Sequence, residues 1–241
     1  MTRRIRWNPI AMQLWCLACL IAAPAQATIK EYTTRSSFAT AVLDSDTDMF
    51  ADLDSQLVPT PLDRPMGRFS YSINATAGTQ SDLIYGLPSA PSSDPATWLT
   101  TNAVESVVTF SGFAPDVNGI GASFFTTTFA GDIWLYPDAA LRVTARFASG
   151  SVSKVLSQTT DTSFLGFVST DQLLTLTIAA IQPASGGPYW LTVGGLTVAS
   201  LSPVPEASTA ALLSVGLSMI GWLARGRRPT STSRKTLWRS S

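Results

Sequence analysis

The feature that most constrains the fold is an alternation of apolar and polar side chains with a period of two residues. It is clearest at residues 141–147, where Leu, Val, Ala and Phe alternate with Arg, Thr and Arg. Successive side chains of a strand point to opposite faces of a sheet, so this pattern predicts a strand with one buried face. The pairs Asn118-Gly119 and Ser149-Gly150 are turn signals of the hairpin kind.

Similar short segments recur along the chain, whereas helical periodicity occurs once, at residues 36–43, where Ser36 or Ser37 can act as the cap. An acidic turn at 44–48 and a proline-rich loop at 59–65 are also expected. We expect strands at 29–32, 49–53, 68–73, 83–85, 106–110, 117–126, 133–136, 141–147, 152–156, 164–168, 173–178 and 189–198. This organisation predicts an all-β fold, a jelly-roll-like β-sandwich with one short N-terminal helix.

The N-terminus has the parts of a secretory signal peptide. Three arginines near the start precede a mostly apolar stretch at residues 10–23, and Ala25 and Ala27 form a small-residue cleavage site. We expect the Sec translocon to export the chain through the inner membrane and residues 1–27 to be removed. The β-sandwich then spans residues 28–202.

A polar motif, an apolar stretch and a group of arginines follow one another at the C-terminus. They are Val204, Pro205 and Glu206, then residues 207–224, then Arg225, Arg227 and Arg228. The apolar stretch has 18 residues without a charge, close to the roughly 20 that cross a bilayer as a helix. The arginines act as a stop-transfer signal, which leaves residues 229–241 as a basic cytoplasmic tail. A plain membrane anchor and a buried apolar helix are the alternatives.

This C-terminal arrangement, at residues 203–228, resembles the PEP-CTERM sorting signal of Gram-negative bacterial surface proteins. The resemblance implies recognition by exosortase, a membrane protease, with the helix embedded in the membrane until processing. It also implies a final location at the cell surface or outside the cell. The chain departs from the usual pattern in two ways: Ala207 replaces the second proline, and 13 residues follow the arginines.

Four short segments of the predicted sandwich resemble a β-sandwich domain that recurs among PEP-CTERM proteins. They are Phe110–Phe113, Gly119–Phe125, Phe164–Val168 and Leu191–Val198. The last strand of the family usually carries Asp-Asn where this chain has Gly194-Gly195. A metal or ligand site built on that pair would therefore be missing here.

The composition excludes several kinds of chemistry. The chain has no histidine, and both cysteines lie in the signal peptide, so Ser-His-Asp catalysis, thiol chemistry and His-ligated or Cys-ligated metals are excluded from the mature protein. Residues 28–203 hold seven basic and 15 acidic residues, a net charge of 7 − 15 = −8. An acidic body disfavours nucleic acid as a partner, because binding to a polyanion needs clustered Lys and Arg.

Asp44, Asp46 and Asp48 are candidate calcium ligands, because their spacing matches the first three oxygen positions of an EF-hand loop. The match breaks where Met49 takes the glycine position and Ser55 the glutamate position. We therefore predict an acidic turn that leads into a strand, with no cofactor.

The remaining candidates are carboxylates at strand ends and a set of aromatic residues. The carboxylates are Glu105, Asp116, Asp132, Asp138, Asp161 and Asp171, and the aromatic residues are Trp98, Trp134, Tyr136, Tyr189 and Trp190. No spacing singles out a pair of carboxylates for glycoside cleavage, so turn formation is the better interpretation. The aromatic residues suit a sugar-binding platform or the core, and core packing is expected for most of them.

These observations predict an exported, exosortase-sorted surface or extracellular-matrix protein that is structural or adhesive and associated with the envelope or exopolysaccharide. No catalytic residue is predicted, and the protein is not expected to be an enzyme. The alternative is a carbohydrate-binding module, calcium-dependent or not. A carboxylate hydrolase of polysaccharide is a third hypothesis, which the unpaired carboxylates disfavour.

Overall fold

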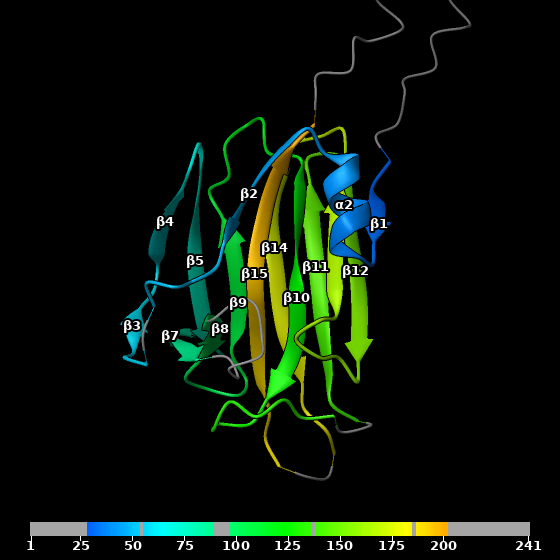
Figure 1. Cartoon of the computed structure of the whole chain (residues 1–241). Helices are drawn as coiled ribbons and strands as arrows, with labels where there is room; N and C mark the ends of the chain where they lie inside the picture. Colours follow the sequence, from blue (N-terminus) through cyan, green and yellow to red (C-terminus); the bar gives the residue numbers. More distant parts are fainter. Residues whose placement is uncertain (1–27, 54, 89–96, 136–137, 185–186, 202–241) are drawn as a thin grey trace, which may run out of the picture. The chain divides into compact units, whose positions relative to one another are not determined.

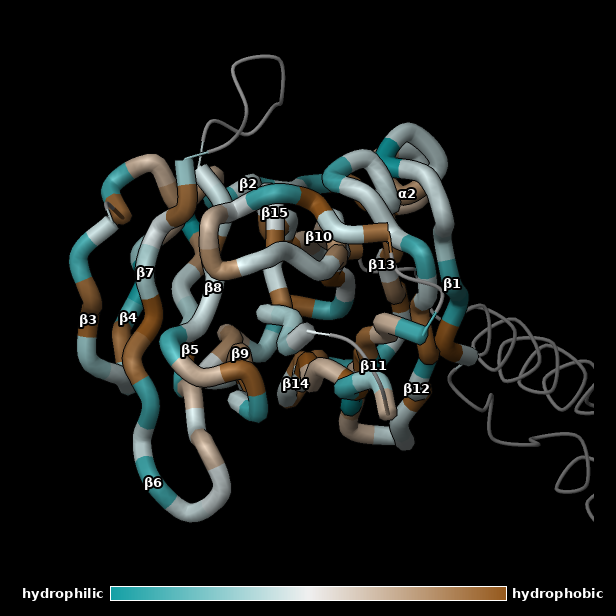
Figure 2. The backbone as a smooth tube through the Cα atoms, turned by 90° about the horizontal axis from the view of Figure 1, so that it is seen from below, coloured by the Kyte–Doolittle hydropathy of each residue, from teal (hydrophilic) through white to brown (hydrophobic). Residues whose placement is uncertain are grey.

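Two antiparallel sheets face each other in the computed structural model, which describes residues 28–53, 55–88, 97–135, 138–184 and 187–201. Most of the strands run up and down in Figure 1, and the view along them in Figure 2 separates the two layers. One short helix, α2 (Arg35–Ala41), is found among the described residues and packs on the outside of one sheet. The predicted β-sandwich with a short helix is confirmed.

The first sheet has the strand order β1-β13-β10-β15-β8-β7-β3, and β2 also pairs with β15. Its strands are β1 (Lys30–Tyr32), β2 (Asp44–Asp48), β3 (Val58–Pro59), β7 (Leu83–Pro88), β8 (Thr97–Thr101), β10 (Gly119–Thr127), β13 (Phe164–Val168) and β15 (Trp190–Ser200). The second sheet has the order β12-β11-β14-β9-β5-β4, and β6 pairs with β5. Its strands are β4 (Leu62–Met66), β5 (Phe69–Ala77), β6 (Gln80–Ser81), β9 (Val107–Ser111), β11 (Ala140–Phe147), β12 (Gly150–Ser157) and β14 (Leu173–Ile181).

The main core lies between the sheets, as the alternation predicts. In β11 the apolar residues Leu141, Val143, Ala145 and Phe147 are all buried, and the polar residues between them are not. By contrast, β10 and β13 are buried along their whole length, so these strands are covered on both faces. Each fully buried Leu, Ile or Phe side chain contributes about 1.5–3 kcal/mol, which makes this core the main source of stability.

The helix is capped earlier than predicted and docks through one side chain. Thr34, not Ser36 or Ser37, is the N-cap, and its Oγ1 accepts a hydrogen bond from the Ser37 amide at 3.2 Å. Phe38 is the buried residue of α2, and its ring lies 5.6 Å from that of Phe164.

Glycine makes this docking possible. A Cβ built on Gly166 would lie 2.5 Å from the Phe38 ring, and one on Gly121 would lie 2.5 Å from the Phe164 ring. The two glycines are paired across β10 and β13. The glycine-containing segments of β10 and β13 therefore form the surface of the sheet on which the helix packs.

Three local predictions are wrong. The strand predicted at 49–53 lies earlier, at β2, and Phe50 takes a turn conformation with φ 53°. The expected loop at 59–65 contains most of β4, whose Pro65 is tolerated because β4 is an edge strand. The strand predicted at 133–136 is reduced to an isolated bridge between Ile133 and Thr127 in the part of this segment that is described.

The turn signals have two outcomes. Phe147 pairs with Gly150, so a hairpin joins β11 to β12 as the Ser149-Gly150 signal predicted. Asn118-Gly119 makes no hairpin: the Asn118 amide donates to the Ala199 carbonyl, and its Oδ1 accepts from the Leu201 amide. Asn118 instead ties the start of β10 to the end of β15.

The Gly194-Gly195 pair lies at an irregularity of the central strands. The pairing of β10 with β15 shifts register between Gly121 and Ser123: Ser123 pairs with Gly194, and Gly195 and Leu196 together lie opposite Ala122. Gly195 has φ +59°, a left-handed conformation that side-chain-bearing residues rarely adopt. In this chain Gly195 lies in a β-bulge, directly after the paired Gly194.

Candidate functional site

The three aspartates singled out as calcium candidates occupy alternate positions of β2 and face the β4–β5 hairpin. Asp48 contacts Arg64, and Asp44 contacts Arg68 with an N–O distance of 2.9 Å. Between them, the Asp46 carboxylate lies against Gly67, where any side chain would collide with it. The predicted acidic turn is therefore wrong: this segment is a strand, held by a complementary hairpin.

This arrangement keeps the carboxylates engaged with separate partners. Within the described ranges, no group of three or more His, Cys, Asp or Glu residues is placed to hold a metal ion. Asp46 also accepts a hydrogen bond from the backbone amide of Thr47 at 2.8 Å.

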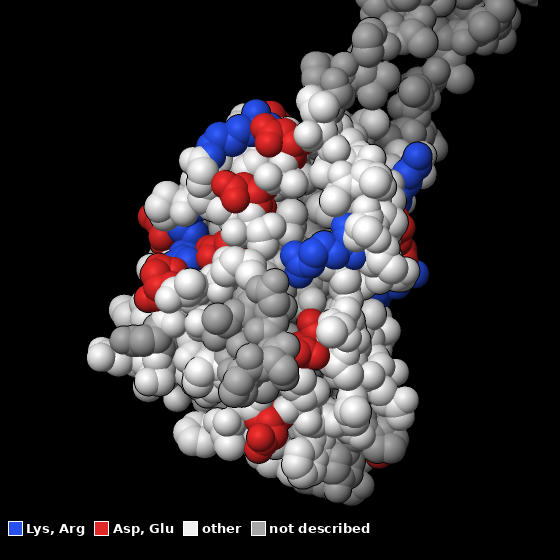
Figure 3. Space-filling model, viewed as in Figure 1, with Lys and Arg blue, Asp and Glu red and all other residues white. Residues whose placement is uncertain are grey.

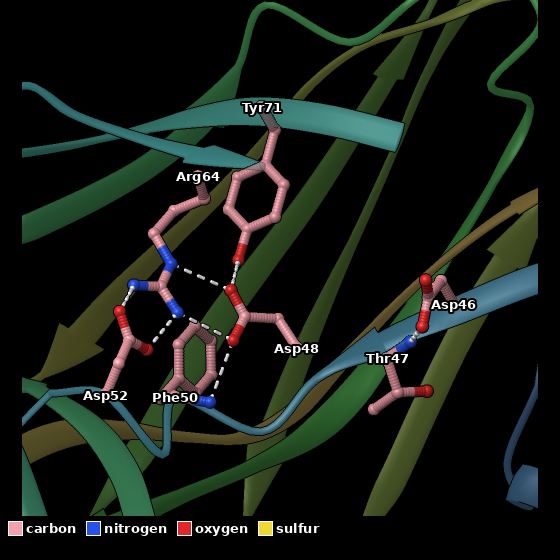
Figure 4. Close-up of polar contacts among 7 residues, drawn as sticks. All are labelled: Asp46, Thr47, Asp48, Phe50, Asp52, Arg64 and Tyr71. Atoms are coloured by element: carbon pink, nitrogen blue, oxygen red, sulfur yellow. Dashed lines mark hydrogen bonds and ion pairs between the residues drawn. The ribbon is translucent and has the colours of Figure 1, made fainter. Parts of the chain in front are cut away.

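Asp48 is the centre of a polar cluster with the buried Arg64 and Tyr71 and the exposed Asp52, which we call the clasp (Figure 4). Its two carboxylate oxygens accept four hydrogen bonds, all between 2.6 and 2.8 Å, from Arg64 Nε, Arg64 Nη2, the Tyr71 hydroxyl and the Phe50 amide. The Asp48 side chain is only 8% exposed. A buried carboxylate is stable in such a site because both of its oxygens accept hydrogen bonds, which offset the loss of hydration.

Arg64 completes the clasp with a second bidentate contact, to Asp52. Its Nη1 and Nη2 donate to the two oxygens of Asp52 at 2.5 and 2.6 Å, and the guanidinium lies 5.9 Å from the centre of the Phe50 ring. The left-handed backbone at Phe50 lets the chain turn so that both aspartates reach the same arginine.

The protonation equilibria follow from this geometry. Burial acts to lower the pKa of Arg64, but the hydrogen bonds to Asp48 and Asp52 outweigh it, so the net shift is upward. Burial, reinforced by the charge of Asp48, raises the pKa of Tyr71 well above its ordinary value. The hydrogen bonds from Arg64 hold the pKa of Asp52 below its ordinary value.

The clasp joins elements of the two sheets. Asp48 lies on β2, which pairs with β15 of the first sheet, whereas Arg64 and Tyr71 lie on β4 and β5 of the second. Its buried groups, Asp48, Arg64 and Tyr71, all have internal hydrogen-bond partners, whereas the Asp52 side chain is 67% exposed. The geometry of the clasp therefore supports a structural role at one side of the sandwich.

Sequence reasoning missed Arg64 and Tyr71. The signal that could have identified Arg64 is its position, since Leu62, Arg64 and Met66 alternate with exposed residues in β4. An arginine at an inward position of a strand requires a buried anionic partner. The aspartates at residues 44–48, earlier in the chain, could have been proposed as that partner.

The other carboxylate candidates lie in turns, bends and loops, as predicted. Asp116 is 3.7 Å from Arg68, and the backbone amides of Asp132 and Asp171 donate to Thr128 and Ser169. Glu105, Asp138 and Asp161 also lie in turns. This placement favours turn formation over a catalytic pair.

The aromatic candidates divide between core and surface. Trp98 and Tyr189 are buried, which confirms core packing for these two, while Tyr136 lies outside the described residues. Trp134 is 38% exposed. Trp190 is half-buried, and its indole N–H donates to the Asn102 carbonyl.

An exposed aromatic residue that sequence reasoning did not single out lies beside Trp190. Phe129 is 68% exposed, and its ring centre is 5.6 Å from that of Trp190 in an edge-to-face arrangement. The loop that carries it follows β10 and is held by backbone hydrogen bonds from Thr128 to Asp132 and from Gly131 to Thr128. The end of the sandwich where β10 finishes carries few charged side chains in the view of Figure 3.

The predicted sorting and cleavage residues lie outside the described residues. They are Val204, Pro205, Glu206, Arg225, Arg227, Arg228, Ala25 and Ala27. The expected span at 207–224 also lies outside, and no helix in the described part of the chain is long and apolar enough to cross a bilayer. Comparison with known proteins finds no matching family and no matching curated protein.

Proposed function

We propose that this protein is an exported surface or extracellular-matrix protein, sorted by exosortase, with a structural or adhesive role and no catalysis. The observation that carries the proposal is the order of its C-terminal segments: Val204-Pro205-Glu206, 18 uncharged residues and then arginines. An N-terminal signal peptide completes the route through the Sec translocon. Exopolysaccharide or the envelope is then the partner.

The sorting role assigns separate tasks to these segments. The apolar stretch enters the bilayer, and the arginines keep its end in the cytoplasm. The polar motif then lies at the outer boundary of the membrane, where exosortase cuts. The buried charges of the clasp, Asp48 and Arg64, hydrogen-bond to each other, which supports a body that serves as a stable module.

The strand order supports the finer assignment of a jelly roll. Counted from β8 to β15 as one to eight, the strands lie in the order 1-8-3-6 in the first sheet and 2-7-4-5 in the second. This nested order is what two interleaved Greek keys produce. Fold alone does not define a function, so the proposal depends on the sorting segments.

Mass spectrometry of protein from the cell-surface fraction tests the sorting. We expect an N-terminus at Thr28 and loss of the chain beyond about Glu206. Replacing Glu206 with Ala should leave the tail attached and the protein in the membrane, whereas Ser231→Ala, beyond the stop-transfer arginines, should change nothing. An intact Ser241 in the surface fraction of the unaltered protein would contradict cleavage and leave a plain anchor.

A carbohydrate-binding role is the second candidate, and the Phe129–Trp190 pair favours it. Exposed aromatic faces stack on the apolar faces of sugar rings, and this pair is held by an ordered loop and by the Trp190–Asn102 hydrogen bond. A glycan array, run with and without calcium, should show binding that Phe129→Ala removes. Leu57→Ala, at a separate exposed apolar residue, is the matched control. Equal binding by both variants would exclude this surface.

A further inference from the structure

The strands at the two ends of each sheet order, β1 and β3 in the first sheet and β4 and β12 in the second, differ in how well they are protected. In the first sheet, β1 has 3 residues, and β3 has 2 and ends in Pro59. In the second sheet, β4 contains Pro65 and contacts β2 through the clasp. Short length, proline and cover are ways in which proteins prevent edge strands from pairing with other chains.

The remaining edge, β12, has none of these protections. It has 8 residues, Gly150–Ser157, without a proline, and most of its side chains are exposed. It pairs with β11 in one unbroken register from Phe147↔Gly150 to Ala140↔Ser157, without a bulge. No described strand pairs with its other side, so that side presents a straight row of backbone donors and acceptors.

The charged residue of β12 already has an ion-pair partner within the same molecule. Lys154 Nζ lies 3.0 Å from a carboxylate oxygen of Glu31 on β1, on the side of β12 that faces the first sheet. A lysine on an edge strand normally opposes strand addition because its charge would be buried. Here the ammonium keeps its partner when another strand arrives. Val155 is 58% exposed on the opposite side of the strand and would gain cover.

We propose that β12 is a self-association surface, on which β12 of a second copy adds in antiparallel orientation about a two-fold axis at Ser153. In this register Val155 of each copy lies beside Ser151 of the other, and Lys154 lies beside Val152. Centring the axis on Lys154 would instead place two ammonium groups opposite each other, which destabilises a strand pair.

The second copy is the occupant that this edge fits, because the same open edge is present in every molecule and a two-fold axis satisfies both at once. The protected β4 edge at the far side of the same sheet stops further addition. The assembly is therefore a closed dimer with a continuous sheet across two molecules. It extends the structural role proposed above and does not depend on how the tail is processed.

Disulfide trapping of the full-length protein in its producing cells tests the register. Antiparallel partners directly opposite each other have Cα atoms about 4.5–5.5 Å apart, within disulfide reach. Ser153→Cys should therefore give a cross-linked dimer on mild oxidation. Ser70→Cys, at an exposed serine of β5, should not exceed the unaltered protein. Ser151→Cys alone should also fail, because its opposite residue is Val155.

The oligomeric mass gives an independent readout. Light scattering of the purified protein should show twice the chain mass, and Ser153→Lys should reduce it to one chain mass while the far-UV circular dichroism spectrum remains that of the unaltered protein. Cross-linking of Ser153→Cys no stronger than that of Ser70→Cys would overturn the proposal, as would a monomer mass for the unaltered protein. Measuring both in Glu206→Ala separates this result from sorting, since a failure of cleavage leaves β12 intact.

Discussion

The two sides of the sandwich are each bridged by an ion pair between the sheets, at nearly the same distance but in different surroundings. Arg64 and Asp48 lie 2.8 Å apart with side chains 9% and 8% exposed. Lys154 and Glu31 lie 3.0 Å apart with side chains 44% and 34% exposed. Distance alone therefore says little about what each bridge contributes.

The difference in burial decides what each side can do. Breaking a buried pair leaves an uncompensated charge in the interior, which costs about 3–5 kcal/mol. An exposed pair is screened by water and contributes about 0–1 kcal/mol. The clasp side is consequently fixed and closed by β2 and β4. The other side is held weakly and leaves the β12 edge available for a partner.

The largest effect is expected from Asp48→Asn. The variant leaves Arg64 charged and short of its partner in the interior, so we expect a loss of about 3–5 kcal/mol in the free energy of unfolding. Urea unfolding measures it. Asp44→Asn on the same strand is the control and should cost less than about 1 kcal/mol, because Asp44 and Arg68 are both about half exposed. Equal losses would contradict the account.

Tyr71→Phe should have the next largest effect, about 1.5–3 kcal/mol, because it removes a hydrogen bond to a buried carboxylate. It should also change the response to alkali. The pKa of Tyr71 is raised in the folded state, so its contribution is complete below the unfolded pKa of about 10 and is lost as the pH rises above that value.

The slope of this alkaline loss is about 1.4 kcal/mol per pH unit for one tyrosine. Unfolding titrations from about pH 9 to about pH 11.5 should show that Tyr71→Phe lowers the slope by this amount. Tyr32→Phe, at a residue that is not in the clasp, should leave the slope of the alkaline loss unchanged. An unchanged slope in Tyr71→Phe would show that the hydroxyl is not held neutral by the clasp.

Asp52→Asn should cost less than about 1 kcal/mol, because the Asp52 side chain is 67% exposed and its pair with Arg64 is screened. Since the pKa of Asp52 is lowered in the folded state, its contribution is complete above the unfolded pKa of about 3.9 and is lost as the pH falls through the folded value. Thermal melts at pH 7 and pH 3 should therefore separate variant and parent only at pH 7. A separation that persists at pH 3 would assign the effect to packing.

The smallest effect is expected at the opposite side. Lys154→Gln should change the free energy of unfolding by no more than about 1 kcal/mol, and added salt should remove the difference. Urea unfolding at low and high ionic strength checks both. A salt-independent loss as large as that of Asp48→Asn would erase the contrast between the two sides.

The sequence predicted the parts of the fold that depend on side-chain periodicity. The alternation at 141–147 located β11, and the single cluster of helical spacing located α2. It failed where a distant segment decides the local conformation. Asp44–Asp48 looks like a turn by composition but forms a strand because β15 and the β4–β5 hairpin flank it.

The clasp could be predicted only in part. The acidic run was visible, and Arg64 occupied an inward position of an alternating segment. The left-handed turn at Phe50 that brings Asp48 and Asp52 to one guanidinium has no local signature in a phenylalanine. The open edge at β12 was equally hidden, because the exposure of an edge depends on which strands pair and not on the residues of the strand itself.

The most direct test of the contrast between the two sides is a pair of double-mutant cycles. One combines Asp48→Asn with Arg64→Gln, and the other combines Glu31→Gln with Lys154→Gln, with unfolding free energies measured for every member. The account predicts a coupling energy of about 3 kcal/mol for the first pair and less than about 1 kcal/mol for the second. Coupling energies of equal size would contradict it.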